Sequence, residues 1–244
     1  MRIFLTAVAT CVLAAGTALA QASTGSGENT GSAAGICIGS GEPGGRYHAF
    51  AERLIEAGLE GSVCNTPTAG SLENLRGLRE GRLAFAIAQN DLAYHQFTGG
   101  HGLERWQDFA AVAPLFPEFV QVFVRQEDNA PDLFGELRGR RINIGVHGSG
   151  STINARDVLA AAGLREGVDY LPANHGMREA FAALGENEVD AVFVTAGENF
   201  EFDADRFSRL AVPPSIITQL ANENPYYESS GLEIDGRIQP SLAT

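Results

Sequence analysis

The chain has 244 residues, of which 44% are hydrophobic and 19% are charged, a composition typical of globular proteins with one large or two small domains. All 17 basic residues are Arg, which excludes a Schiff-base lysine and the lysine of a Walker-type phosphate loop. The 30 acidic residues give a formal net charge of −13, which argues against nucleic acid and anionic membranes as partners.

Residues 1–20 have the pattern of a signal peptide, with Arg2, an apolar stretch over residues 3–16 and a small-residue cleavage site that ends at Ala20. The apolar stretch is too short for a permanent membrane span. Residues 21–35 are rich in Gly, Ser, Thr and Ala, which predicts a flexible leader. We therefore expect a protein exported to the periplasm and not inserted in the membrane.

Two cysteines, Cys37 and Cys64, remain after this cleavage. An even pair in an oxidising compartment favours a disulfide, and the two residues lie in the first and second predicted strands. The alternative is a pair of buried thiols that pack as small apolar residues. Two cysteines without a matching His spacing make a poor zinc site.

From residue 36 onward, extended runs alternate with amphipathic segments. Extended runs are predicted at residues 36–40, 61–67, 83–89, 111–116, 119–126, 142–146, 168–172, 189–195 and 209–212. Helices are predicted at residues 45–57, from 70–71 through Leu78, through Leu92 and Tyr94, after 148–152 through Leu159, at 177–184, and through Ile216 and Leu220. This alternation predicts an α/β fold of parallel-rich sheets with flanking helices. The pattern restarts after Pro117, which predicts lobe I at residues 36–116 and lobe II at 117–212.

Five loops that follow predicted strands carry Gly, hydroxyl or amide groups where a helix begins. They are residues 39–47, 68–71 with Asn74, 89–91 with Tyr94, 148–152 and 195–199. In parallel α/β sheets such loops hold the functional groups. The loop at 148–152, GSGST, would place hydroxyl groups and a helix dipole around an anionic group. Capping of the next helix by Ser151 or Thr152 explains this loop equally well.

Enzymatic functions have weaker support. Residues 39–44, GSGEPG, match the G-x-G-x-x-G dinucleotide fingerprint, but the second strand ends in CNTP, without an acidic residue to bind a ribose. An exported NAD-dependent oxidoreductase is therefore the weaker alternative. No serine lies in a G-x-S-x-G elbow, and the five histidines have no metal-ligand spacing. We expect no enzyme, no cofactor and no metal.

Four segments in order resemble the TAXI-type solute-binding proteins of TRAP transporters. They are GSGEPGGRYHAF, TPTAGSLENLRGLREGRLAFAIAQNDLAY, LRGRRINIGVHGSGSTINARDVLAAAGL and VDAVFVTAG. The corresponding family motifs usually read T-G-G-T-Y-Y-P, T-G-G-S-x-E-N-L and G-x-x-G-S-G-T. The resemblance covers residues 36–231. It implies a two-lobed periplasmic-binding-protein type 2 fold that closes a ligand cleft on a small carboxylate, such as an amino acid or dicarboxylate.

The resemblance also implies a set of ligand-binding positions. They are Gly45, Tyr47, Gly70, Ser71, Asn74, Gln89, Ser149, Ser151 and Thr152. The chain departs from the family at Arg46, where Thr is usual, at His48, where Tyr is usual, and at Ala69, where Gly is usual. If Arg46 faces the cleft it can bind a carboxylate through two hydrogen bonds, and if it faces outward it is a surface residue. Family members usually continue with elements that return to lobe I, so residues 213–244 are expected to be a shortened return segment.

We therefore expect a monomeric receptor that binds a solute without chemistry and delivers it to TRAP membrane permease subunits. Contacts of the solute with both lobes would shift the equilibrium toward a closed form. The same module would serve equally well as the ligand sensor of a receptor kinase. Permease genes beside its own gene would separate these two functions.

Overall fold

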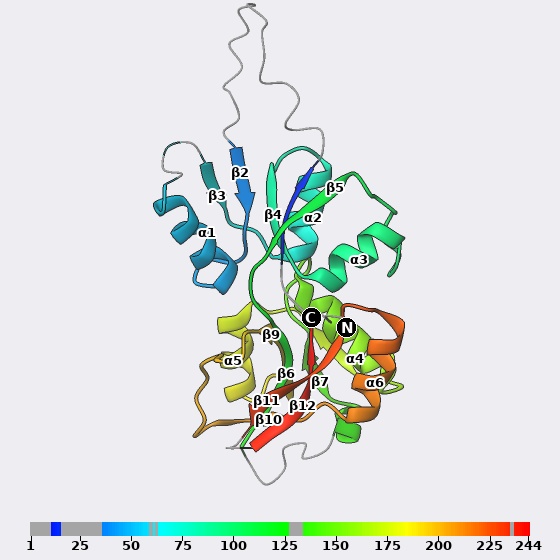
Figure 1. Ribbon diagram of the computed structural model, residues 1–244. Helices are drawn as coiled ribbons and strands as arrows, with labels where there is room; N and C mark the ends of the chain where they lie inside the picture. Colours follow the sequence, from blue (N-terminus) through cyan, green and yellow to red (C-terminus); the bar gives the residue numbers. More distant parts are fainter. Residues whose placement is uncertain (1–10, 16–35, 59–60, 62, 127–133, 235–236) are drawn as a thin grey trace, which may run out of the picture. The chain divides into compact units, whose positions relative to one another are not determined.

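The structure is a computed structural model that describes residues 11–15, 36–58, 61, 63–126, 134–234 and 237–244 (Figure 1). The chain divides into two compact units, which we call the N-terminal unit, Thr10–Leu115, and the C-terminal unit, which contains Phe116–Thr244. The expected two-lobed α/β class is confirmed. Most of the predicted signal peptide and the whole of the predicted leader lie outside the described residues.

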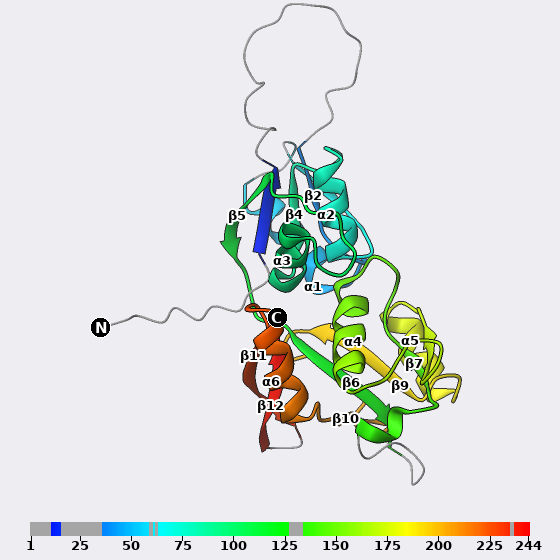
Figure 2. The ribbon, with the colours of Figure 1, turned by 90° about the vertical axis from the view of Figure 1, so that its right-hand side faces the viewer.

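The N-terminal unit contains a five-stranded sheet with the order β3-β2-β4-β1-β5. Its strands are β1 (Cys11–Ala15), β2 (Ile36–Gly39), β3 (Val63–Thr66), β4 (Phe85–Ala88) and β5 (Phe109–Pro114). Its helices are α1 (Arg46–Glu56), α2 (Ser71–Arg79) and α3 (Asn90–Thr98). Strands β3, β2 and β4 are parallel, whereas β1 runs antiparallel between β4 and β5 (Figure 2).

Apolar side chains at helical spacing attach these helices to the sheet. Ile38, Ala51 and Ile87 form a buried cluster, against which Tyr47 and Phe50 of α1 pack. Helix α2 likewise buries Leu75 and Leu78, three residues apart on one face. The parallel strands are thereby covered, and the loops at their carboxyl ends lead directly into α1, α2 and α3.

The C-terminal unit contains a seven-stranded sheet with the order β11-β12-β6-β9-β7-β8, in which β10 also pairs with β6. Its strands are β6 (Phe119–Arg125), β7 (Arg141–Asn143), β8 (Leu171–Ala173), β9 (Ala191–Ala196), β10 (Phe207–Leu210), β11 (Glu228–Ile234) and β12 (Arg237–Ala243). Its helices are the 3-10 helix η1 (Phe134–Leu137) and the α-helices α4 (Gly150–Ala161), α5 (Met177–Gly185) and α6 (Pro214–Glu223). Strands β8, β7 and β9 are parallel, and β6 is antiparallel to β9, β10 and β12.

Alternating residues of β6 build two cores on opposite faces of this sheet. Val120, Val122 and Val124 belong to a buried cluster with residues of α4 and α6. Phe123 belongs to a second cluster, formed with residues of α5 and β9. Successive residues of a strand point to opposite faces of the sheet, so a strand covered on both faces needs an almost continuous apolar sequence. Every residue of β6 except Arg125 is buried.

Three features of the fold differ from the expectation. Both sheets are mixed rather than mainly parallel, because β1 and β6 each run against the parallel strands. The predicted strand at 142–146 ends at Asn143, since Gly145 adopts a left-handed φ of 92° and turns the chain. Residues 213–244 belong to the C-terminal unit, where they form α6 and the hairpin β11–β12, and are not a return segment to lobe I.

Candidate functional site

Asn74 is the centre of a polar cluster in the N-terminal unit and is fully buried. Its amide nitrogen donates to the carbonyl of Ser40, just after β2, and to the carbonyl of Ile87, in β4, at 2.8 Å. Its Oδ1 accepts from Thr68 Oγ1, in the loop after β3, at 2.7 Å. One side chain therefore joins the ends of all three parallel strands, and both of its amide hydrogens are used inside the protein.

Ser71 and Gln89 connect the next two loops in the same way. The backbone amide of Gln89 donates to Ser71 Oγ at 3.1 Å, and both side chains are buried. Gly70, directly before Ser71, has a φ of 126°, which residues with a side chain rarely adopt. The structure thus brings Gly70, Ser71, Asn74 and Gln89 together, as the resemblance implies, and gives the three side chains hydrogen bonds within the unit.

The first helix begins at Arg46, with Gly45 as its N-cap residue. Tyr47 packs against the buried cluster of the N-terminal unit, so its ring contributes to the core. Arg46 is exposed in the first turn of α1. Of the three positions in this loop, Arg46 is the one whose charged group is suited to recognising an anion.

His48, at a position where TAXI-type proteins usually have Tyr, links α1 to β3. Its Nδ1 lies 3.2 Å from Asn65 Nδ2, and its Nε2 lies 3.1 Å from Glu52 Oε1. Ser40 Oγ lies 3.4 Å from the same Nδ1, which gives a Ser-His-Glu series with the composition of a hydrolase triad. Ser40 is fully buried, however, and its hydroxyl donates to Asn65 Oδ1 at 2.6 Å. This serine is a structural donor without the exposure that a nucleophile needs.

In the C-terminal unit, the turn before α4 is hydrogen-bonded to Val146, in the loop that follows β7. Ser149 is the N-cap residue, and its Oγ accepts from the Thr152 amide at 3.3 Å. The hydroxyls of Ser149 and Thr152 both donate to the Val146 carbonyl, at 2.8 and 2.7 Å. The cap is therefore Ser149, and not Ser151 or Thr152 as the sequence suggests.

Ser151 instead connects this turn to the end of β9. Its Oγ accepts from the Thr195 amide at 3.1 Å. Thr195 Oγ1 donates to Asn154 Oδ1 at 2.8 Å, and Asn154 Nδ2 donates to the Tyr227 hydroxyl at 2.9 Å. The Tyr227 hydroxyl donates in turn to Asp157 at 2.6 Å. Two of the five predicted loops are thus joined by a buried hydrogen-bond chain.

The sequence interpretation did not single out Asn154, Asp157 or Tyr227. The available signal was a pair of polar residues three apart on the apolar face of a predicted helix. Residues at this spacing lie side by side, and both are buried here. A buried amide and carboxylate need partners, and Tyr227, beyond α6, supplies them.

Ion pairs fix the opposite end of the parallel strands in the C-terminal unit. Asp190 accepts from the Arg141 guanidinium at 2.8 Å and from the Arg141 backbone amide at 2.8 Å, and Arg125 lies 3.7 Å away. Burial alone would raise the pKa of Asp190, but the Arg141 hydrogen bonds and both charges outweigh it and lower the pKa. Asp190 therefore remains ionised and joins the starts of β7 and β9.

The N-terminal unit also contains a histidine pair that the sequence spacing did not indicate. The rings of His95 and His101 lie 4.1 Å apart, and the backbone between them turns through Gly99, which has a φ of 82°. Burial, with a smaller contribution from His101, lowers the pKa of His95 to about 4. His95 is therefore neutral at physiological pH. The expected absence of a metal stays a prediction.

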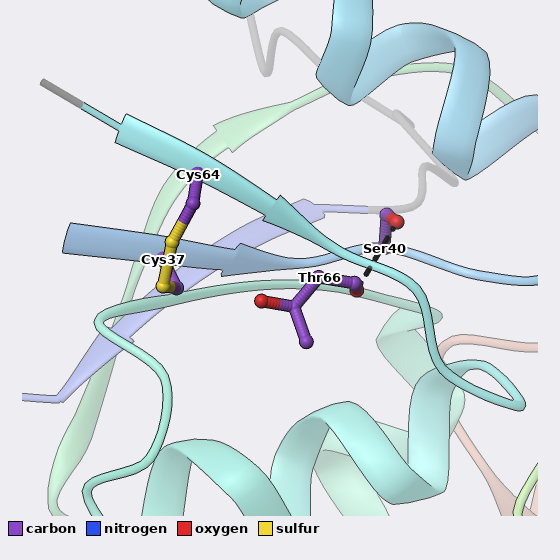
Figure 3. The surroundings of a disulfide bond; sticks show 4 residues. All are labelled: Cys37, Ser40, Cys64 and Thr66. Atoms are coloured by element: carbon purple, nitrogen blue, oxygen red, sulfur yellow. Dashed lines mark hydrogen bonds between the residues drawn. A yellow bond between two sulfur atoms is a disulfide. The ribbon is translucent and has the colours of Figure 1, made fainter. Parts of the chain in front are cut away.

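Cys37 and Cys64 form a disulfide between β2 and β3 (Figure 3). The two residues are direct partners in the parallel register, with their Cα atoms 4.5 Å apart. Farther along the same strand pair, the Ser40 amide donates to the Thr66 carbonyl at 3.1 Å. The bond thus ties the edge strand β3 to the sheet that carries the Asn74 cluster.

Within the described parts of the chain, no helix combines the length and the apolar character needed to cross a membrane.

The model of one protein family, described as the NMT1-like family, matches residues 38–227. Among solved structures, the chain is similar to the periplasmic aliphatic sulphonate binding protein SsuA from Escherichia coli, at 17% identity and a TM-score of 0.40. That match covers 86% of this chain and 64% of SsuA, so the chain spans less than two thirds of that protein.

Two further similar structures are complexes with amino acids. An ancestral arginine-binding protein bound to arginine has 15% identity and a TM-score of 0.47, with 86% of this chain and 80% of that chain covered. The GluR0 ligand-binding core from Nostoc punctiforme in complex with (L)-glutamate has 14% identity and a TM-score of 0.47, with 85% and 83% covered. At these identities and TM-scores, none of the three assigns a ligand or a partner to this chain.

Proposed function

Since the chain belongs to the NMT1-like family, we propose that it is a solute-binding receptor that captures a small anion outside the cytoplasmic membrane. One observation carries this proposal: within each unit, the polar loops at the ends of the parallel strands are joined by hydrogen bonds. These loops meet around Asn74 in the N-terminal unit and around Thr195 in the C-terminal unit. Loops at the carboxyl ends of parallel strands are where α/β folds bind small molecules.

The start of α4 supports a carboxylate as the anionic group. The helix begins at Gly150, directly after its cap Ser149, so its first turn carries the positive end of the helix dipole. Ser149 Oγ accepts from the amide of Thr152, and the Ser149 amide donates to the Val146 carbonyl. The amides of the two residues between them, Gly150 and Ser151, have no acceptor within the helix. Amides of this kind bind carboxylates and phosphates.

Arg46 is the cation in the N-terminal unit that best suits an anionic solute. It is exposed at the first turn of α1, and it is the only arginine between residues 36 and 52. A protein with a net charge of −13 repels anions at long range, so a local guanidinium that binds through two hydrogen bonds has a large effect on selectivity.

The resemblance of residues 36–231 to TAXI-type proteins supports a narrower assignment. In it, the protein has a type 2 periplasmic-binding-protein fold, works in the periplasm, binds an amino acid or dicarboxylate without chemistry or cofactor, and hands it to TRAP permease subunits. The buried, internally bonded Ser40 fits a protein that is not an enzyme. Sensing for a receptor kinase uses the same binding step and differs in the membrane partner.

Thermal-shift measurements on the full chain test the binding step. The panel contains amino acids, dicarboxylates and keto acids, with alkane sulfonates as a second anion class and sugars as neutral solutes. A ligand that binds the folded protein raises the melting temperature once its concentration exceeds its Kd. We expect a concentration-dependent rise with at least one carboxylate and none with sugars.

Two substitutions in α1 form a matched pair for this test. Arg46→Gln removes the exposed guanidinium of the first turn, whereas Arg53→Gln removes an exposed guanidinium from the last turn of the same helix. We expect Arg46→Gln to reduce the ligand-induced shift while Arg53→Gln leaves it unchanged. A shift with sulfonates alone would contradict the carboxylate assignment, and no shift with any anion in folded protein would contradict solute binding.

A further inference from the structure

The hydrogen-bond chain of the C-terminal unit has one buried end and one accessible end. At the buried end, Asp157, Tyr227 and Asn154 are 7%, 2% and 0% exposed. At the other end, Thr195 is the one residue of β9 that is not buried, and Ser151, which is bonded to it, is half-buried as well. Ser151 and Thr195 are therefore the two members of this chain that remain accessible.

The Asp157 carboxylate fixes the direction of every hydrogen bond in the chain. An ionised carboxylate can only accept, so the Tyr227 hydroxyl donates to Asp157, at 2.6 Å. The Tyr227 oxygen then accepts from Asn154 Nδ2, at 2.9 Å. This orientation of the amide turns Asn154 Oδ1 toward Thr195 Oγ1, which donates to it at 2.8 Å. The Thr195 hydroxyl therefore has lone pairs to offer to a solute but no hydrogen.

The hydroxyls at the start of α4 differ from one another in the same respect. Those of Ser149 and Thr152 donate to the Val146 carbonyl, so their hydrogens are already used. Ser151 Oγ accepts from the Thr195 amide, and among the described residues the Ser151 hydroxyl hydrogen has no acceptor. Ser151 can therefore donate to a solute, whereas the hydroxyl of Thr195 can only accept from one.

We propose that Thr195 selects solutes that carry a hydrogen-bond donor on the carbon next to their carboxylate, and that Asp157 is the positioning residue that imposes this selection through Tyr227 and Asn154. The inference rests on the proposed function and specifies its solute class, α-amino or 2-hydroxy acids. Their ammonium or hydroxyl group donates to Thr195, and their carboxylate accepts from Ser151. A 2-oxo acid would bring a carbonyl oxygen to the Thr195 oxygen, and two acceptors in contact lack a hydrogen to share.

Calorimetry with acids of matched carbon skeletons tests the selection. The probes are alanine, lactate and pyruvate, and the longer set glutamate, 2-hydroxyglutarate and 2-oxoglutarate. In at least one set, we expect the amino or hydroxy acid to bind the full chain at least about tenfold more tightly than the 2-oxo acid. Thr195→Val removes the acceptor at nearly constant shape and should bring this affinity ratio close to one. Thr195→Ser keeps the hydroxyl and should preserve the ratio.

Asp157→Asn tests the positioning role. The new amide group can donate to the Tyr227 oxygen, which frees the Tyr227 hydrogen to turn toward Asn154 and the Thr195 hydrogen to turn toward the solute. The affinity ratio should fall at least about threefold, because the 2-oxo acid binds more tightly than it binds wild type. Asp190→Asn is the matched control, since it removes another buried carboxylate of the same unit that lies outside the chain. It should leave the ratio unchanged.

Neutron diffraction from crystals of the deuterated full chain locates the same hydrogen without a solute. In wild type the hydroxyl hydrogen of Thr195 should point to Asn154 Oδ1, and in Asp157→Asn it should not be confined to this direction. A wild-type hydrogen that points away from Asn154 would overturn the role of Asp157.

The binding results separate this inference from the proposed function. Tighter binding of the 2-oxo acids would overturn the selection and leave solute binding intact. So would binding of a plain dicarboxylate such as succinate by a chain that binds none of the amino and hydroxy acids. Failure of every anion to bind folded protein would contradict the proposed function and the selection together, and the hydrogen position would still decide the role of Asp157.

Discussion

The two units have the same strand plan, β3-β2-β4-β1-β5 and β8-β7-β9-β6-β10, but keep it together by different means. In the C-terminal unit the five common strands come from one continuous stretch, and buried clusters on both faces of β6 hold them. In the N-terminal unit three separate connections join the strands: the pairing of β1 with β4, the disulfide between β2 and β3, and the hydrogen bonds of the Asn74 side chain. Removal of a single connection should therefore lower the stability of the N-terminal unit more than it lowers the stability of the C-terminal unit.

Removal of the disulfide should have the largest effect. Replacing Cys37 and Cys64 by Ala frees a loop with a sequence separation of 27, which should cost about 3–4 kcal/mol of unfolding free energy by the loop-entropy estimate. Trp106 is the only tryptophan and lies in the N-terminal unit, so its fluorescence during urea unfolding reports on that unit. An unchanged urea midpoint would show that packing, and not the cross-link, determines the stability of this unit.

Asn74→Ala should lower the stability of the N-terminal unit by about 2–3 kcal/mol. The substitution removes the amide group that donates to the buried carbonyls of Ser40 and Ile87 and accepts from the Thr68 hydroxyl. Asn90→Ala, at the half-buried first residue of α3, is the matched control and should change stability by less than about 0.5 kcal/mol. Trp106 fluorescence measures both, and equal effects would contradict a bracing role for Asn74.

Asp190→Asn should lower the stability of the C-terminal unit by about 2 kcal/mol at neutral pH, because it weakens the bonds from Arg141 and the attraction to Arg125. Since folding lowers the pKa of Asp190, its contribution is complete above the unfolded pKa of about 3.9 and disappears as the pH falls through the folded pKa. Urea unfolding followed by circular dichroism at pH 7 and pH 3 measures this. A difference between wild type and variant that stays the same at pH 3 would contradict the ionic role.

Ser149→Ala should have the smallest effect, about 1 kcal/mol, as for other N-cap serines. Ser151→Ala is its neighbour control, because Ser151 accepts from Thr195 and does not cap α4. The same two proteins separate capping from solute binding. If these hydroxyls contact the solute, ligand affinity falls by a larger free energy than stability does, and if they only cap or brace, affinity is retained in the folded protein.

Much of the fold could be predicted because the residues that decide it are close in sequence. Apolar alternation in residues 119–125 and helical spacing of Leu75 and Leu78 each specify one element, and both elements form as expected. The direction of β6 and the place of β1 could not be predicted in this way. Strand pairing across the chain depends on which edges remain open, and the apolar pattern of residues 11–15 suits a signal peptide and a buried strand equally.

The candidate site was predictable as a set of loops but not in the roles of its side chains. Gly, Ser and Asn at strand ends marked Ser71, Asn74 and Ser151 as polar groups near a helix start. Their hydrogen-bond partners are backbone groups of other strands, such as the Ile87 carbonyl and the Thr195 amide. Sequence motifs carry no record of such partners, and for this reason Ser149 was missed as the cap and Tyr227 was missed altogether.

Isothermal titration calorimetry of the full chain with the carboxylates selected by thermal shift tests the central claim, that this protein is a solute receptor, most directly. The account predicts saturable binding of one carboxylate per chain, weakened by Arg46→Gln and unaffected by Arg53→Gln. Absence of saturable binding by any carboxylate, in protein whose two units are shown to be folded by hydrogen exchange, would contradict it.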